Sequence, residues 1–74
     1  MGSELENTIR VQRAIKNITQ EELAAAVGVT RKTINTIENG IYTPSATLAL
    51  RMARYFGIPV EELFRLPDDT DGEG

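Results

Sequence analysis

The chain has 74 residues, the length of one small domain with a modest core. It contains no Cys and no His, which excludes disulfides, thiolate metal sites and a histidine general base. We therefore expect no metal and no cofactor. The net charge is −3, a sign that does not by itself favour nucleic-acid binding.

The negative charge is concentrated at the two ends of the chain. Residues 1–6 contain Glu4 and Glu6, and residues 67–74 contain four acidic residues and no basic one. Between them, residues 7–66 carry eight basic and five acidic residues, a net charge of +3. We expect a folded domain over 7–66, after a disordered or tag-derived start (1–6) and before a disordered acidic tail (67–74).

No segment of the sequence predicts export or a membrane span. The longest apolar run is near Leu23–Val29, far short of the roughly 18 residues that a span needs. No apolar signal segment follows Met1. The expected location is the cytoplasm, with no membrane partner.

Helix boundary signals divide the chain into five helices. The first is expected from about Asn7, as N-cap, to Lys16. The second begins at Thr19, where Glu22 three residues later completes a capping box, and ends at Gly28. The remaining three are expected at residues 30–39, 45–56 and just after Pro59, with Pro67 ending the fold. No strand is expected, so the fold class is all-α.

The stretch from Thr19 to Gly40 carries the functional signal. Only Gly28-Val29-Thr30 separates its two helices, and so short a turn makes them cross steeply. Ala24 is small where the helices approach, and Ile34 and Ile37 form an inward face. This pattern is typical of a helix-turn-helix.

The opposite face of the helix at 31–39 is polar. Arg31 and Lys32 lie in its first turn, the part of a recognition helix that goes deepest into the major groove. Thr33 and Thr36 offer a methyl group to thymine and a hydroxyl to other groups. A solvated helix start is the alternative for Arg31 and Lys32, but cations there oppose the helix dipole.

These residues resemble the lambda-repressor-like helix-turn-helix regulators, the phage-repressor type or XRE family. The resemblance covers roughly Ile9 to Phe64 and rests on Thr-Gln-Glu-Glu-Leu-Ala, Gly-Val-Thr-Arg, Thr-Ile and Ile-Glu-Asn-Gly at this spacing, followed by Pro44-Ser45 and Gly57-Ile58-Pro59. It implies a five-helix DNA-binding domain, and a transcriptional regulator that is not an enzyme.

The resemblance also implies roles for single residues. Base contacts are expected from Arg31, Lys32, Thr33 and Thr36. Phosphate contacts are expected from Gln20, Asn35 and Asn39, beside the free N–H groups near Thr19 and the Tyr42 hydroxyl. Arg13 and Glu38 are expected to form a structural ion pair. For Thr33, Thr36 and Asn39, a purely structural role in the helix is as well supported as a contact with DNA.

The apolar content of the last third predicts a second interface. We expect a homodimer surface around the fifth helix, formed by Ile58, Val60, Leu63 and Phe64, although core packing accounts for most of this apolar surface. The predicted function is a regulator, expected to be a repressor, that binds an inverted repeat in double-stranded DNA. The alternative is an antitoxin-like or adaptor module whose main partner is another protein, which the acidic net charge favours.

Overall fold

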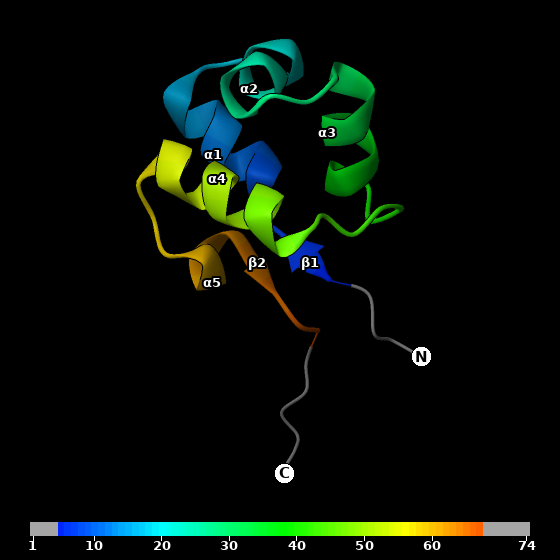
Figure 1. The fold of residues 1–74 in the computed structure, drawn as a ribbon. Helices are drawn as coiled ribbons and strands as arrows, with labels where there is room; N and C mark the ends of the chain where they lie inside the picture. The colour runs from blue at the N-terminus through cyan, green and yellow to red at the C-terminus, as the bar shows by residue number, and fades with distance from the viewer. Residues whose placement is uncertain (1–4, 68–74) are drawn as a thin grey trace, which may run out of the picture.

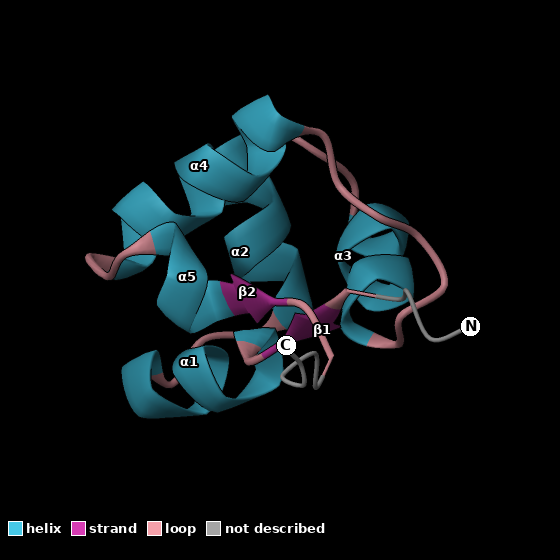
Figure 2. Cartoon of the chain, turned by 90° about the horizontal axis from the view of Figure 1, so that it is seen from below, coloured by secondary structure: helices cyan, strands magenta, loops and turns pink. Residues whose placement is uncertain are grey.

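The computed structural model describes residues 5–67, and within them it has the five predicted helices. Residues 1–4 and 68–74, expected to be disordered, lie outside the described part of the chain. The helices are α1 (Ile9–Lys16), α2 (Gln20–Val27), α3 (Arg31–Glu38), α4 (Ala46–Phe56) and α5 (Val60–Leu63). They surround one core, with α3 and α5 on opposite sides of it (Figures 1 and 2).

The fold class is all-α as predicted, and two short strands that the sequence did not predict accompany the five helices. β1 (Glu6–Asn7) pairs antiparallel with β2 (Phe64–Arg65), and the register places Glu6 opposite Arg65. Each strand has only two residues, too few for an alternating pattern to be visible in the sequence. Glu6 takes part in this pairing and Leu5 packs against the core, although both belong to the segment 1–6 that we expected to be disordered.

The first helix begins later than predicted because Asn7 has another role. Its Oδ1 accepts a hydrogen bond from the Ile9 backbone N–H at 3.1 Å, while its Nδ2 donates to the Ile37 carbonyl at 3.0 Å. The N-cap of α1 is Thr8, and Asn7, one residue earlier in β1, connects the start of this helix to α3.

The boundaries of α2 and α3 follow from local capping. Thr19 and Glu22 form the predicted capping box, with Thr19 N–H to Glu22 Oε1 at 2.8 Å and Glu22 N–H to Thr19 Oγ1 at 3.0 Å. Gly28 ends α2 with φ +82°, a left-handed conformation that glycine adopts without steric cost. The chain therefore turns sharply into α3.

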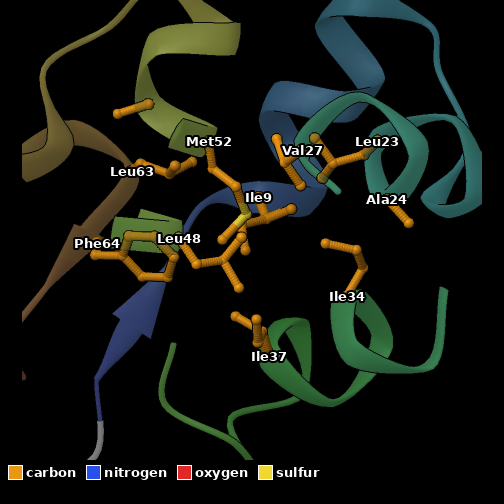
Figure 3. Packing of buried hydrophobic residues seen from close by; sticks show 11 residues of the cluster. Ile9, Leu23, Ala24, Val27, Ile34, Ile37, Leu48, Met52, Leu63 and Phe64 are labelled. Atoms are coloured by element: carbon orange, nitrogen blue, oxygen red, sulfur yellow. The ribbon is translucent and has the colours of Figure 1, made fainter. Parts of the chain in front are cut away.

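The core consists of side chains from every helix and from β2 (Figure 3). Its largest fully buried members are Ile9, Leu23, Ile34, Ile37, Met52 and Leu63. Ile34 and Ile37 point from α3 toward residues of α2 and α4 (Figure 3). Because both isoleucines are buried, the rotation of α3 about its own axis is fixed, and with it the set of side chains that α3 turns outward.

Candidate nucleic-acid interface

The α2–α3 unit has the close packing that its sequence predicted. Ala24 is 3% exposed, and Ile34 is completely buried between the two helices and α4. Val29, in the turn, is half-buried against the same core. One side of α3 is thus packed against the core, and its other side is exposed to solvent.

The candidate base-contacting residues lie together on that open side. Arg31 and Lys32 are exposed at the N-terminal end of α3, and Thr33 and Thr36 are half-buried beside them. With Ile41 and Tyr42 of the following loop, the last three of these residues line a surface pocket of about 310 Å³. Tyr42 is therefore brought to the recognition helix as well.

The threonine hydroxyls on this face already have partners within the protein. Thr36 Oγ1 donates to the Thr33 carbonyl at 2.9 Å, and Thr33 Oγ1 lies 3.0 Å from Thr30 Oγ1. The Thr36 hydroxyl hydrogen is thus used inside α3. The Thr36 side chain can therefore offer DNA its two oxygen lone pairs and its methyl group, but not a hydrogen-bond donor.

Gln20, Asn35 and Asn39 form a connected group of amides between α2 and α3. Gln20 Nε2 donates to Asn35 Oδ1 at 3.2 Å and to Glu38 Oε1 at 3.1 Å. Asn39 Nδ2 donates to the Asn35 carbonyl at 2.9 Å. Gln20 was expected to contact a phosphate, and in the structure both hydrogens of its amino group are donated to groups inside the protein.

Glu38 lies at the centre of a charged cluster. Its side chain is completely buried, Arg13 Nε is 2.6 Å from its Oε2, and Arg10 Nε is 3.6 Å from its Oε1. Burial opposes ionisation of this carboxyl, but hydrogen bonds from Arg13 and Gln20 and the charges of Arg13 and Arg10 prevail and lower its pKa. Arg10 was not predicted here, although its spacing three residues before Arg13 places it on the same helix face.

The first turn of α2 retains backbone donors. Gln20 and Glu21 have N–H groups without a hydrogen-bond partner within residues 5–67, whereas the Glu22 N–H is capped by Thr19. The Thr19 hydroxyl accepts in that capping bond, so its own hydrogen is available to an acceptor. The structure therefore places Thr19 beside a pair of unpaired donors, as expected.

Comparison with known proteins identifies the fold. The family model described as helix-turn-helix matches residues 9–63. The chain belongs to this family. It is the lambda-repressor-like class whose motif the sequence resembles, and its members are transcriptional regulators with a DNA-binding fold, not enzymes.

Individual relatives support the same assignment of the helix-turn-helix domain. An HTH-type transcriptional regulator of Methanocaldococcus jannaschii is 45% identical, over 88% of this chain and 98% of the relative. The CTXphi transcriptional repressor RstR from Vibrio cholerae is 33% identical over 74% of this chain, which spans 50% of that repressor. The crystal structure of the restriction-modification controller protein C.AhdI from Aeromonas hydrophila has a TM-score of 0.70 and 32% identity, covering 76% and 85% of the two chains.

The four residues expected in a dimer interface differ in their exposure in the single chain. Leu63 is completely buried and Phe64 is 7% exposed, both within the core of a single chain. Both side chains belong to the core cluster of buried residues. Ile58 and Val60 are half-buried and line a groove between α4 and α5.

The sequence-based prediction also missed a residue at this groove. Leu50 is 58% exposed at its edge. The available signal was its position in α4: Leu50 lies outside the inward stripe that contains Leu48 and Met52. An apolar side chain off the buried face of an amphipathic helix is a candidate interface residue.

Among residues 5–67, no helix combines the length and apolar character needed to cross a membrane.

Proposed function

We propose that this chain is a sequence-specific transcriptional regulator that binds double-stranded DNA and reads the major groove with α3. The observation that carries the proposal is the division of α3 into a buried face, Ile34 and Ile37, and an exposed leading end, Arg31 and Lys32. Arg and Lys suit the guanine O6 and N7 acceptors. The leading end of the second helix is also the part that enters the groove deepest.

Phosphate contacts come from residues on either side of α3. Unpaired N–H groups at the start of α2, with the Thr19 hydroxyl, provide donors on one side. Tyr42, 51% exposed, provides a hydroxyl on the other. Such contacts hold the helix in register over the bases without reading the sequence.

We propose further that the regulator is a homodimer joined through the α4–α5 groove. The groove has a volume of about 490 Å³ and is lined by Thr47, Leu50, Arg51, Ala53, Arg54, Ile58 and Val60. In this dimer the exposed Leu50 of each copy inserts into the groove of the other copy, as two-fold symmetry requires. Arg51 and Arg54 at the groove complement the exposed Glu61 and Glu62 of α5.

A symmetric dimer accounts for specific binding by so small a domain. Two copies on one frame bind with an increased effective concentration. Their recognition helices fit an inverted repeat whose half-sites are about 34 Å apart, one turn of DNA. Similarity to a phage repressor supports repression, by occupying DNA that transcription requires, and such a regulator works in the cytoplasm.

Selection from a random DNA pool tests the DNA-binding proposal. The purified protein at moderate salt should enrich an inverted repeat with half-sites about one helical turn apart. Arg31→Ala with Lys32→Ala should abolish the enrichment while the protein remains folded. Retention that disappears uniformly as salt rises, without any enriched sequence, would leave only general attraction to the backbone and refute specific readout.

Sedimentation of two matched variants tests the dimer surface. Leu50→Asp should convert the dimer to a monomer, because it places a charge in the apolar groove. Ile15→Asp is the control, since Ile15 is 72% exposed on α1, away from the groove. A dimer that survives Leu50→Asp but dissociates with Ile15→Asp would place the interface on α1.

A protein-partner function is the second candidate, and α1 favours it. Val11 and Ile15 are 56% and 72% exposed, four residues apart on one helix face. A partner protein that covers this face would suit the acidic net charge. A stable complex that survives loss of Arg31 and Lys32 but not of Ile15, in a chain that selects no DNA, would establish this function instead.

A further inference from the structure

A chain of hydrogen bonds connects the buried ion pair to the exposed surface of α3. It runs from Arg13 to Glu38 at 2.6 Å, from Glu38 to Gln20 Nε2 at 3.1 Å, and from Gln20 Nε2 to Asn35 Oδ1 at 3.2 Å. Its inner end is charged and buried, and its outer end is an exposed amide. The direction of each amide in such a chain is decided by the group before it.

Glu38 decides the direction of the Gln20 amide. An ionised carboxylate only accepts hydrogen bonds, and the lowered pKa keeps Glu38 ionised near neutral pH. Gln20 must therefore turn its amino group, not its oxygen, toward Glu38. The other hydrogen of the same amino group is then directed at Asn35.

Asn35 is held from two sides. Its Oδ1 accepts from Gln20 at 3.2 Å and from Asn39 Nδ2 at 3.3 Å. Asn39 is itself oriented, because the same Nδ2 donates to the Asn35 carbonyl at 2.9 Å, and a carbonyl only accepts. The Asn35 oxygen is thus turned inward, and its Nδ2 has no hydrogen-bond partner within residues 5–67.

We propose that Glu38, acting through Gln20, holds the Asn35 amide with its nitrogen outward, so that Asn35 donates a hydrogen bond to a phosphate oxygen of bound DNA. The inference rests on the proposed DNA-binding function and on the phosphate contact expected of Asn35, and it adds the orientation of the amide and the residues that impose it. Asn35 touches the DNA, whereas Gln20, Glu38 and Asn39 position it.

The place of Asn35 favours a phosphate over a base. It is the fifth of the eight residues of α3, on the flank beside the first residue of α2. Arg31 and Lys32 occupy the end that enters the groove deepest. An Asn with its oxygen engaged also cannot form the paired contact with adenine, which needs a donor and an acceptor together.

DNA with single uncharged phosphates tests the contact. Each phosphate of the selected site is replaced in turn by a methylphosphonate, and affinity is measured for the wild type and Asn35→Ala. One position per half-site should cost the wild type about fivefold or more, as loss of one charge-assisted hydrogen bond does. Asn35→Ala should be insensitive at that position and remain sensitive at the others.

A matched arm distinguishes a phosphate from a base. Guanines of the same site are replaced by 7-deazaguanine, which lacks the N7 acceptor. If Asn35→Ala loses sensitivity at a guanine and not at a phosphate, Asn35 reads a base and the proposal is wrong. A wild type that selects no DNA site overturns the proposed function itself. Specific binding with an unchanged methylphosphonate profile in Asn35→Ala overturns this inference alone.

Asn35→Asp separates the inward bonds from the outward donor. Aspartate still accepts from Gln20 and Asn39, so its melting temperature should stay close to that of the wild type. It has no hydrogen to donate, and its affinity for the selected site should fall at least as far as that of Asn35→Ala. An Asn35→Asp variant that binds DNA as tightly as the wild type would show that no donor is required there.

Glu38→Gln tests the positioning role, since an amide can turn either atom toward Gln20. We expect the sensitivity at the Asn35-dependent phosphate to disappear while the other phosphates retain theirs. A purely structural role would weaken binding uniformly and leave that profile unchanged. Gln20→Met breaks the chain at an intermediate point, closer to the surface, and should lose the same single position. If both variants keep the wild-type sensitivity to each methylphosphonate, Glu38 and Gln20 do not position Asn35 and the inference is wrong.

Discussion

The two faces of α3 differ in what holds them. Ile34 and Ile37 on the inward face are buried in the core, with exposed fractions of 0% and 1%. On the outward face Arg31, Lys32 and Asn35 are exposed, and Asn35 is fixed by hydrogen bonds rather than by packing. The same eight-residue helix therefore contributes to stability on one side and to recognition on the other.

This difference makes folding and DNA binding separable by mutation. A change on the inward face should alter the free energy of unfolding, and a change on the outward face should alter the affinity for DNA. Glu38 lies where the two meet, since it is buried like the core yet its Oε1 accepts a hydrogen bond from Gln20.

The largest effect is expected at Ile34. Ile34→Ala should lower the free energy of unfolding by about 2–5 kcal/mol, because it leaves a cavity between α2, α3 and α4. Urea unfolding followed by circular dichroism measures it. Lys32→Ala on the outward face is the control and should leave the unfolding midpoint almost unchanged. Equal losses of stability in Ile34→Ala and Lys32→Ala would contradict the difference between the inward and outward faces of α3.

A somewhat smaller loss is expected at Arg13. Arg13→Met should cost about 3 kcal/mol, at the low end for a broken buried pair, because Arg10 remains near Glu38. Arg31→Met is the control, since Arg31 is exposed, lies outside the α4–α5 groove and makes no ion pair within residues 5–67. Thermal unfolding of the two variants side by side gives the comparison. If Arg13→Met had the same melting temperature as the control, the ion pair between Arg13 and Glu38 would contribute nothing to stability.

On the outward face, the expected loss is in binding. Arg31→Ala and Lys32→Ala should each weaken specific binding by about 1–3 kcal/mol if they contact base edges. Titration of labelled operator DNA at fixed salt measures the change, and an unselected sequence of the same length is the control. Losses that are equal on both DNAs would assign these residues to phosphates.

The smallest effect is the response to acid. The pKa of Glu38 lies below its ordinary value of 4.5, so the native state holds this proton less tightly than the unfolded state. Its contribution to stability is complete above the ordinary pKa and is lost as the pH falls through the lowered value. Wild type should therefore lose more stability than Glu38→Gln between about pH 6 and pH 3. Parallel curves would contradict the assignment.

Local signals made most of the fold predictable. Thr19 with Glu22 determines where α2 begins, Gly28 determines where it ends, and the spacing of Ile34 and Ile37 fixes the buried face of α3. Each of these depends on residues within a few positions of one another, so one sequence is sufficient to reveal them.

Contacts between distant segments were not predictable in the same way. The pairing of β1 with β2 joins residues near the two ends of the domain, and it places Phe64 in the core instead of in an interface. The direction of the Asn35 amide depends on Gln20, fifteen positions earlier. Neither leaves a periodic pattern, because the partners meet only after the helices have packed.

The most direct test of the division between the two faces of α3 is the change in backbone amide resonances when the selected DNA is added to labelled protein. Perturbations should be concentrated at the start of α2, at Arg31, Lys32, Asn35 and Thr36, and in the loop at Tyr42. Amides at the Ile58 groove between α4 and α5 should change little. Perturbations centred on α1 or α5, with α3 unaffected, would contradict the assignment of α3 as the recognition helix.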